Sequence, residues 1–202
     1  MSKKIVTLAV AAGMLACLVW AAGPAQAQSG GGCQLKGTAS FHQPLTNNSA
    51  PFTYDFGGQL ASCQSNQQGA PGSGAVSAGR TLPFNGEAFQ EPTPSGNGSC
   101  GSGTTHGFAI AKWAGGSYTV IKYQTQSAAA AVQLQGTVAP SLTLKAIHPK
   151  PGQPKYHTVK TTMYAGARAL GVLTFTPSDP QDCSGTGVHS APINGFTGLG
   201  NQ

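Results

Sequence analysis

The chain has 202 residues, of which 8% are charged, and its formal net charge is +6. So few charges exclude a long-helix protein, whose exposed faces need many acidic and basic side chains, and they favour a surface of Ser, Thr, Gly and Gln. A surface of that kind is typical of extracellular β domains.

The N-terminal segment, residues 1–27, predicts export through a cleaved signal peptide. A positively charged start is followed by an apolar run over residues 5–22, and Ala25 and Ala27 are the small residues that a signal peptidase recognises. We expect cleavage after Ala27 and secretion into the extracellular space, with no stable membrane anchor.

Two other interpretations of this segment stay open. The apolar run over residues 5–22 is near the minimum length for spanning a membrane, so an uncleaved anchor helix is the first alternative. The second is a lipoprotein modified at Cys17, because the residues before it loosely match a lipidation signal. The apolar run continues past Cys17, and Pro24 lies just before the cleavage site, so both features favour cleavage.

Four cysteines remain in the expected mature chain, residues 28–202, which is long enough for one domain with a real core. An even number of cysteines in an oxidising compartment predicts two disulfides, whereas a zinc site would need close C-x-x-C pairs. Of the three connectivities we prefer Cys33–Cys63 with Cys100–Cys183. Antiparallel pairing of the first two strand-like runs would bring Cys33 and Cys63 to the same end of that pair.

Apolar and polar residues alternate with a period of two along most of the mature chain, and this pattern predicts β-strands. The alternating runs are residues 34–41, 52–56, 108–113, 118–125, 132–138, 142–144, 156–165 and 170–176. The Gly115–Gly116 pair predicts a tight turn between two of them. Many short strands without helices indicate a sandwich or a barrel. We expect an all-β, antiparallel β-sandwich of about eight strands, Ig-like or jelly-roll-like.

Two segments predict irregular structure within this single secreted domain. Residues 64–104 are rich in Gly, Ser, Pro and Asn and contain few apolar anchors. Residues 147–155 carry three prolines and predict a loop that projects between two strands.

Several short segments form a pattern: a cysteine soon after the signal, residues 96–100, the turn at 113–116, and the closing segments 175–183 and 195–198. In these features the chain resembles a group of uncharacterised secreted proteins typical of actinobacteria. The resemblance covers most of the mature chain and implies export and a small disulfide-containing β fold. It implies no activity and no functional residues.

Residues that usually catalyse hydrolysis are few. No Gly-x-Ser-x-Gly motif is present, and the five carboxylates form no obvious pair. A small secreted hydrolase using His106 or His189 with a nearby Ser or Asp is therefore kept as an alternative. Asp179, Asp182 and His189 suggest a cation site, but aspartates that cap a turn explain this cluster better. We expect no catalytic residue, no metal and no cofactor.

Basic residues are concentrated in the middle of the chain. Between Pro92 and Ser178 lie seven Lys and Arg residues and no Asp or Glu. Four lysines and one aromatic residue surround the proline-rich loop, namely Lys145, Lys150, Lys155, Tyr156 and Lys160. A basic loop on a rigid β domain suits an anionic cell-wall polymer, an anionic polysaccharide or extracellular nucleic acid, and a tyrosine ring there can stack on a sugar or a base.

The leading functional hypothesis is a non-enzymatic extracellular protein that associates with the cell surface or an acidic polymer through these residues. A simpler interpretation is that scattered lysines keep a secreted protein of low charge soluble. A third hypothesis is a coat or matrix component that self-associates through exposed strand edges.

Overall fold

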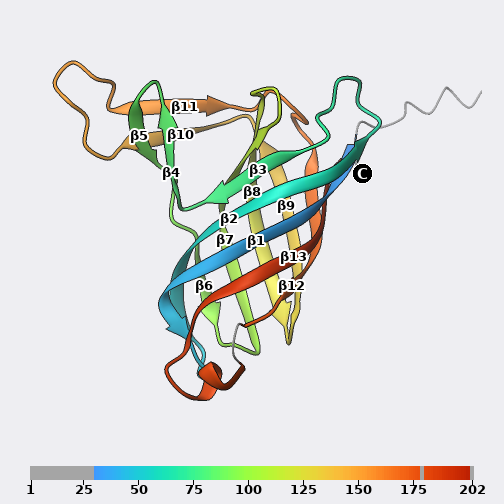
Figure 1. The fold of residues 1–202 in the computed structure, drawn as a ribbon, viewed down its shortest axis with the longest axis vertical. Helices are drawn as coiled ribbons and strands as arrows, with labels where there is room; N and C mark the ends of the chain where they lie inside the picture. The colour runs from blue at the N-terminus through green and yellow to red at the C-terminus, as the bar shows by residue number, and fades with distance from the viewer. Residues whose placement is uncertain (1–29, 178–179, 201–202) are drawn as a thin grey trace, which may run out of the picture.

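The computed structural model describes residues 30–177 and 180–200, so the expected signal peptide and Cys17 lie outside the described residues. The described residues form thirteen β-strands and one short 3₁₀ helix (Figure 1). The elements are β1 (Gly30–Leu45), β2 (Ala50–Ser65), β3 (Gly74–Ala78), β4 (Thr81–Phe84), β5 (Glu87–Gln90), β6 (Ser95–Gly98), β7 (Ser102–Trp113), β8 (Tyr118–Ala128), β9 (Ala131–Ala139), β10 (Ser141–Ala146), β11 (Tyr156–Lys160), β12 (Arg168–Phe175), η1 (Pro180–Ser184) and β13 (Val188–Gly200). All strand pairs are antiparallel, which confirms the predicted all-β class. Within the described ranges, no helix has the length and apolar character needed to cross a membrane.

The main sheet closes into a barrel instead of dividing into the two sheets of the expected sandwich. Its strands follow the order β1-β13-β12-β9-β8-β7-β3-β2, and β2 pairs back with β1. Strands in a sandwich and in a barrel both alternate inward and outward side chains. The sequence pattern was therefore right about the strands and wrong about how they are arranged.

One position in the barrel wall is shared by two short strands. β3 and β6 run in the same direction, and each pairs with both β2 and β7 at a different height. Between them the chain leaves the wall to form the hairpin of β4 and β5 (Figure 1). The segment 64–104 is therefore not irregular as expected. Two of its apolar anchors are buried, Val76 at 9% and Phe89 at 1% exposure, and their packing supports the short strands β3 and β5.

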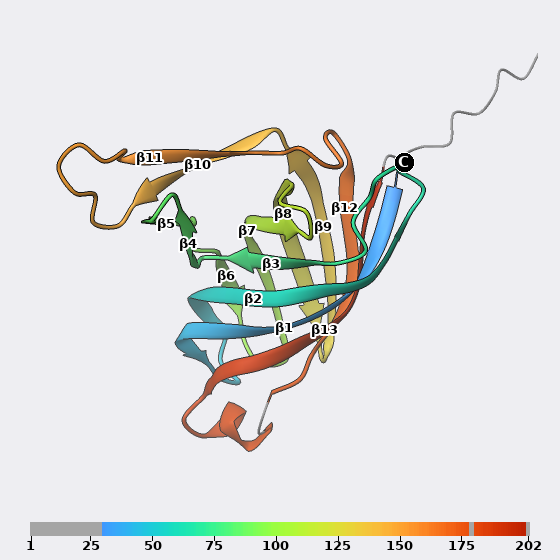
Figure 2. The same cartoon turned by 45° about the horizontal axis from the view of Figure 1, so that its top comes forward.

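A second sheet with the order β11-β10-β5-β4 covers the outside of the barrel at β7 and β8. Phe89, Leu144 and Val159 of this small sheet pack against Ile110 and Val120 of the barrel wall. β7 and β8 therefore bury side chains on both of their faces. The β10–β11 hairpin extends sideways beyond the barrel (Figure 2), and its connection over residues 147–155 is the projecting loop that was predicted.

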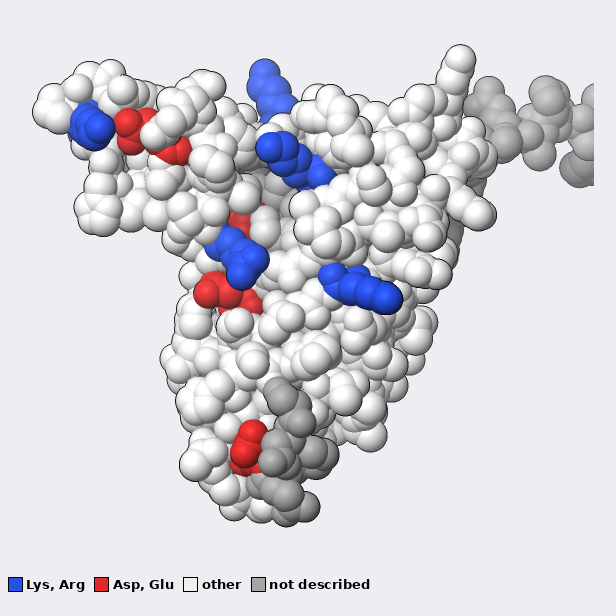
Figure 3. Space-filling view, viewed as in Figure 1, with Lys and Arg blue, Asp and Glu red and all other residues white. Residues whose placement is uncertain are grey.

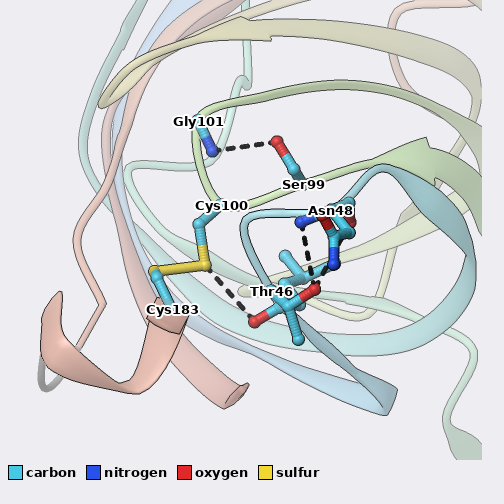
Figure 4. Close-up of a disulfide and its surroundings, with 7 residues drawn as sticks. Thr46, Asn48, Ser99, Cys100, Gly101 and Cys183 are labelled. Carbon is cyan, nitrogen blue, oxygen red and sulfur yellow. Dashed lines mark hydrogen bonds between the residues drawn. A yellow bond between two sulfur atoms is a disulfide. The ribbon is translucent and has the colours of Figure 1, made fainter. Parts of the chain in front are cut away.

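Both preferred disulfides are present, and they lie at opposite ends of the barrel. Cys33–Cys63 joins β1 to β2, which pair as the prediction required. Cys100–Cys183 joins the turn before β7 to η1 (Figure 4). At this end the backbone N–H of Cys100 donates to the carbonyl of Thr46 at 2.8 Å. The second disulfide therefore holds three separate segments together.

Two clusters of apolar side chains occupy the ends of the barrel interior. The cluster that includes Trp113 and Tyr164 lies at the end with the first disulfide. The cluster that includes Phe52 and Phe175 lies at the end with the second disulfide. Each end of the barrel is thus covered by large rings and tied by a covalent bridge.

Candidate functional site

The lysines singled out in the sequence lie on the β10–β11 hairpin and its loop. Lys145 and Tyr156 are direct cross-strand neighbours, and Lys160 pairs with Ser141 at the other end of the ladder. Along β10 and β11 these exposed positions alternate with buried ones such as Leu144. Lys145, Tyr156 and Lys160 therefore share one solvent-facing side of the hairpin.

The hairpin holds these side chains at a fixed spacing. Between the two lysines lies the pair Thr143 and Thr158, whose hydroxyl oxygens are 3.1 Å apart. At about 3.4 Å per residue, Lys145 and Lys160 are separated by about 14 Å along the strand direction. Tyr156 is 62% exposed, so its ring is accessible to a ligand.

The rest of this outward face is free of acidic side chains within the described residues. Lys150 and Lys155 are exposed on the adjoining loop and add two further positive charges. The outward positions of β4 and β5 are uncharged, namely Thr81, Pro83, Ala88 and Gln90. Glu87 alternates with Ala88 and so lies on the face that carries Phe89, toward the barrel.

A second basic surface was missed by the sequence analysis. A groove of about 420 Å³ lies between the outer wall of β2, β3 and β7 and the strand β4, and its lining includes Lys36, Arg80 and Lys112. Among the described residues, no acidic side chain lines it. The guanidinium of Arg80 lies directly over Gly57, so a Cβ at that position would displace it. These cations come from distant parts of the sequence, so no local pattern indicates the groove.

The seven cations of the central segment do not converge on one patch. Lys122 and Arg168 lie on a third surface, on either side of Thr137 in the wall of β8, β9 and β12. On the face shown in Figure 3, the basic side chains are scattered, and acidic side chains lie directly beside two of them. The hairpin is the place where several of the predicted residues share one face.

The hydrolase hypothesis relied on His106 or His189 with a nearby Ser or Asp. His106 Nε2 lies 3.2 Å from Ser95 Oγ on the neighbouring strand, and His189 is exposed on β13. Of the residues considered for a cation, Asp179 lies outside the described residues, and the backbone carbonyl of Asp182 closes the following turn. In the described ranges, no three His, Cys, Asp or Glu side chains gather closely enough to hold a metal ion.

His42 has both a hydroxyl and a carboxylate neighbour, which the sequence did not suggest. Its Nδ1 lies 3.0 Å from Thr53 Oγ1, and its Nε2 lies 3.2 Å from Asp55 Oδ2. The Thr53 hydroxyl donates to Gln43 Oε1 at 3.1 Å, so its hydrogen points away from the imidazole that would have to accept it. The His42 side chain is 43% exposed, and none of these residues lines the groove or the barrel interior. The cluster therefore lacks the enclosed site that a nucleophile needs.

Glu91 is a buried carboxyl group at the point where the chain returns to the barrel wall. It is 1% exposed and accepts hydrogen bonds from Ser77 Oγ at 2.8 Å and from the backbone N–H of Arg80 at 2.9 Å. Burial raises the pKa of Glu91 to about 7, while the two hydrogen bonds and the charge of Arg80 oppose the rise. Glu91 lies in the segment 64–104 that was expected to be irregular, and its burial depends on strands that are distant in sequence.

No protein-family model matches the chain, and neither a curated protein nor a solved structure shows significant similarity to it. Its function is therefore inferred from its own residues and their arrangement.

Proposed function

We propose that the protein acts outside the cell as a non-enzymatic module that associates with an anionic polymer, such as a cell-wall polymer or an acidic polysaccharide. The contact surface is the outward face of the β10–β11 hairpin. The observation that supports this most directly is the strand register, which sets Lys145 beside Tyr156 and places Lys160 further along the same face. The N-terminal segment and the two disulfides support an extracellular site of action.

An extended polymer does not need a deep pocket, because it can contact several shallow subsites in a row. Lysines attract the polyanion over long range and displace its condensed counterions, and both effects weaken as salt is added. Tyr156 adds an apolar ring on which a sugar can stack. The hairpin is braced by β5 and by packing on the barrel, so little conformational freedom is lost when the polymer binds.

The test is retention of the oxidised protein on heparin and on purified cell wall as a function of NaCl concentration. We expect retention at low salt that falls steeply as salt rises. The double variant Lys145→Gln/Lys160→Gln should elute at clearly lower salt. The matched control is Lys36→Gln/Lys112→Gln, which removes the same charge from the groove.

The control separates a specific surface from a general effect of positive charge. An equal loss of retention in both double variants would mean that net charge alone is responsible, and the hairpin would not be the site. A larger loss in the groove variant would move the site there. Absence of retention at low salt would refute polymer association altogether.

The self-association hypothesis is less well supported by the fold, because it relied on exposed strand edges. Closure of the barrel leaves its strands paired on both sides, which removes the edges of the main sheet. Among the described strands, the remaining edges are β4 and β11 of the small sheet, and β11 carries Tyr156, Thr158 and Lys160. A lysine on an edge strand opposes pairing with a second copy of the chain.

A further inference from the structure

The barrel encloses a cavity of about 170 Å³ that is lined by residues of both apolar clusters. The inward face of β7 explains why this space is not filled. On this face, every second residue from Gly103 to Ala111 is Gly, Thr or Ala, and the first large ring is that of Trp113. An eight-stranded barrel is just wide enough for side chains to fill its interior, so a wall of small residues leaves a void.

Apolar side chains that face this space remain partly uncovered although they lie inside the barrel. Ile121, Leu134 and Ile193 line the cavity, and each keeps part of its surface accessible. Side chains beside a void lose dispersion contacts on that side. A ligand with matching apolar surface would restore those contacts.

Hydroxyl groups form a chain along one side of the cavity. Tyr123 Oη lies 2.7 Å from Tyr54 Oη, which lies 3.0 Å from Thr105 Oγ1, and this atom lies 2.8 Å from Thr125 Oγ1. Each hydroxyl has one hydrogen to donate. Four hydroxyls joined by three hydrogen bonds therefore leave one hydrogen that has no acceptor among these four groups. All four residues line the cavity, so this hydrogen is available to an oxygen atom of a ligand.

The cavity disfavours ions, because none of the described residues that line it carries a charge. Burial raises the pKa of Tyr54. Burial also raises the pKa of Tyr123 well above its ordinary value, and the neighbouring Tyr54 adds to this rise. Both phenols therefore stay neutral. An ion in this space would lose its hydration without gaining an opposite charge, and that exchange is strongly unfavourable.

We propose that the barrel interior binds one small, uncharged, mostly apolar molecule with a single hydroxyl or carbonyl oxygen, which accepts or shares a hydrogen bond with the hydroxyl chain. A cavity of about 150 Å³ can hold benzene. The cavity of about 170 Å³ therefore suits a ligand of about six to eight non-hydrogen atoms. This site is separate from the β10–β11 hairpin, so it does not depend on polymer binding.

The two ends of the cavity differ in how they are closed. At one end Trp113 and Tyr164 pack with their ring centroids 5.7 Å apart, and the indole N–H of Trp113 donates to Thr119 Oγ1 at 2.9 Å. At the other end the lining includes the rings of Phe52 and Phe175 and the small residues Ser99 and Gly103. Trp113 lines the cavity, so its indole signal would report the arrival of a ligand.

The test uses the oxidised chain of residues 28–202 and three probes that share a six-membered ring: benzene, phenol and benzoate. Titration calorimetry measures affinity and stoichiometry. The indole N–H NMR signal reports the location, because Trp113 is the one tryptophan in this range. We expect one site per chain, phenol bound several-fold more tightly than benzene, and no binding of benzoate.

Variants then separate the roles of shape and hydrogen bonding. Thr125→Val and Tyr123→Phe remove the hydroxyls at the two ends of the chain, and at least one of them should abolish the advantage of phenol over benzene. Thr137→Val, on the exposed face of β9, is the matched control and should change neither affinity. Ala109→Leu fills the void and should abolish binding of both probes, while circular dichroism and a melting curve check its fold.

Absence of heat and of a Trp113 shift with both benzene and phenol near their solubility limits would overturn the proposal. Benzoate binding as tightly as phenol would also overturn it, and so would an unchanged preference for phenol in both end variants. If Ala109→Leu fails to fold, the probe series and the two end variants still decide. A failure of polymer retention would leave this result unaffected, since the two experiments use different ligands.

Discussion

The buried carboxyl group of Glu91 should make the protein less stable as pH rises toward neutrality. Its pKa is about 7 in the folded protein against an ordinary value of 4.5. Between these values the unfolded chain has released a proton that the folded protein keeps. The stabilisation is therefore fully present below about pH 4.5 and is lost as pH rises through about 7.

The size of this effect follows from the difference in pKa. At about 1.4 kcal/mol for each tenfold change in proton affinity, the difference corresponds to about 3 kcal/mol in total, of which about 2–3 kcal/mol is lost between about pH 5 and 8. Glu91→Gln keeps the shape but does not titrate. Its amide oxygen can accept from the Arg80 N–H, and its amide nitrogen can donate to the Ser77 hydroxyl, which also accepts. The variant should therefore lack this loss of stability.

Urea unfolding of the oxidised protein at several pH values, followed by Trp113 fluorescence, measures the free energy of unfolding directly. The matched control is Glu87→Gln on β5, which should keep the pH dependence of the parent protein because Glu91 is still present. Stability curves that run parallel for the parent protein and Glu91→Gln would refute the assignment of the effect to Glu91.

Two further predictions concern stability at a fixed pH. Replacing both cysteines of a disulfide by alanine should lower the free energy of unfolding by about 3–4 kcal/mol for Cys33–Cys63 and by about 4–5 kcal/mol for Cys100–Cys183, because the second bridge closes the longer loop. Denaturant unfolding without reductant compares the two variants. A larger loss for Cys33–Cys63 would contradict the loop-entropy explanation. Thr119→Val removes a fully buried hydroxyl that accepts from Trp113 Nε1 and donates to the Met163 carbonyl, each at 2.9 Å. It should lower the free energy of unfolding by about 2–4 kcal/mol. Thr137→Val on the outer wall is the control and should change the free energy of unfolding little. Equal effects of the two substitutions would mean that the buried hydrogen bonds of Thr119 do not stabilise the fold.

Features that depend on neighbouring residues could be predicted from the sequence. The strands follow from the alternation of apolar and polar residues, because each strand buries one face. The turn between β7 and β8 follows from Gly115 and Gly116, which adopt φ values of 102° and 87°. The Cys33–Cys63 bridge follows from pairing of the first two long strands.

Features that depend on which strands pair with each other could not be predicted. Alternation shows which side chains share a face, but it does not identify the neighbouring strand, so sandwich and barrel were indistinguishable. The strands β3 to β6 have four or five residues each, which is too short for a periodic signal in a Gly-rich segment. They exist because β2 and β7 hold β3 and β6, and the barrel wall supports the small sheet.

The candidate site was predicted only in part. The sequence identified the lysines and Tyr156, but their common face depends on the register of β10 with β11. A slip of one residue along β11 would turn Tyr156 and Lys160 to the opposite face. The groove and the barrel interior combine residues from many strands, so neither has a local sequence pattern.

Ring closure gives this chain a particular order of events during its synthesis. The barrel is completed by β13, the last 13 residues of the described chain, which pair with β1 at the start and with β12. Before β13 is available, β1 and β12 each present an unpaired backbone edge to their surroundings. The final step must therefore wait for β13 and joins it to β1, which is distant in sequence, so folding is slow. During that interval the unfinished molecule is open to strand exchange with its neighbours, so crowding of newly made chains is the condition under which it should misassemble.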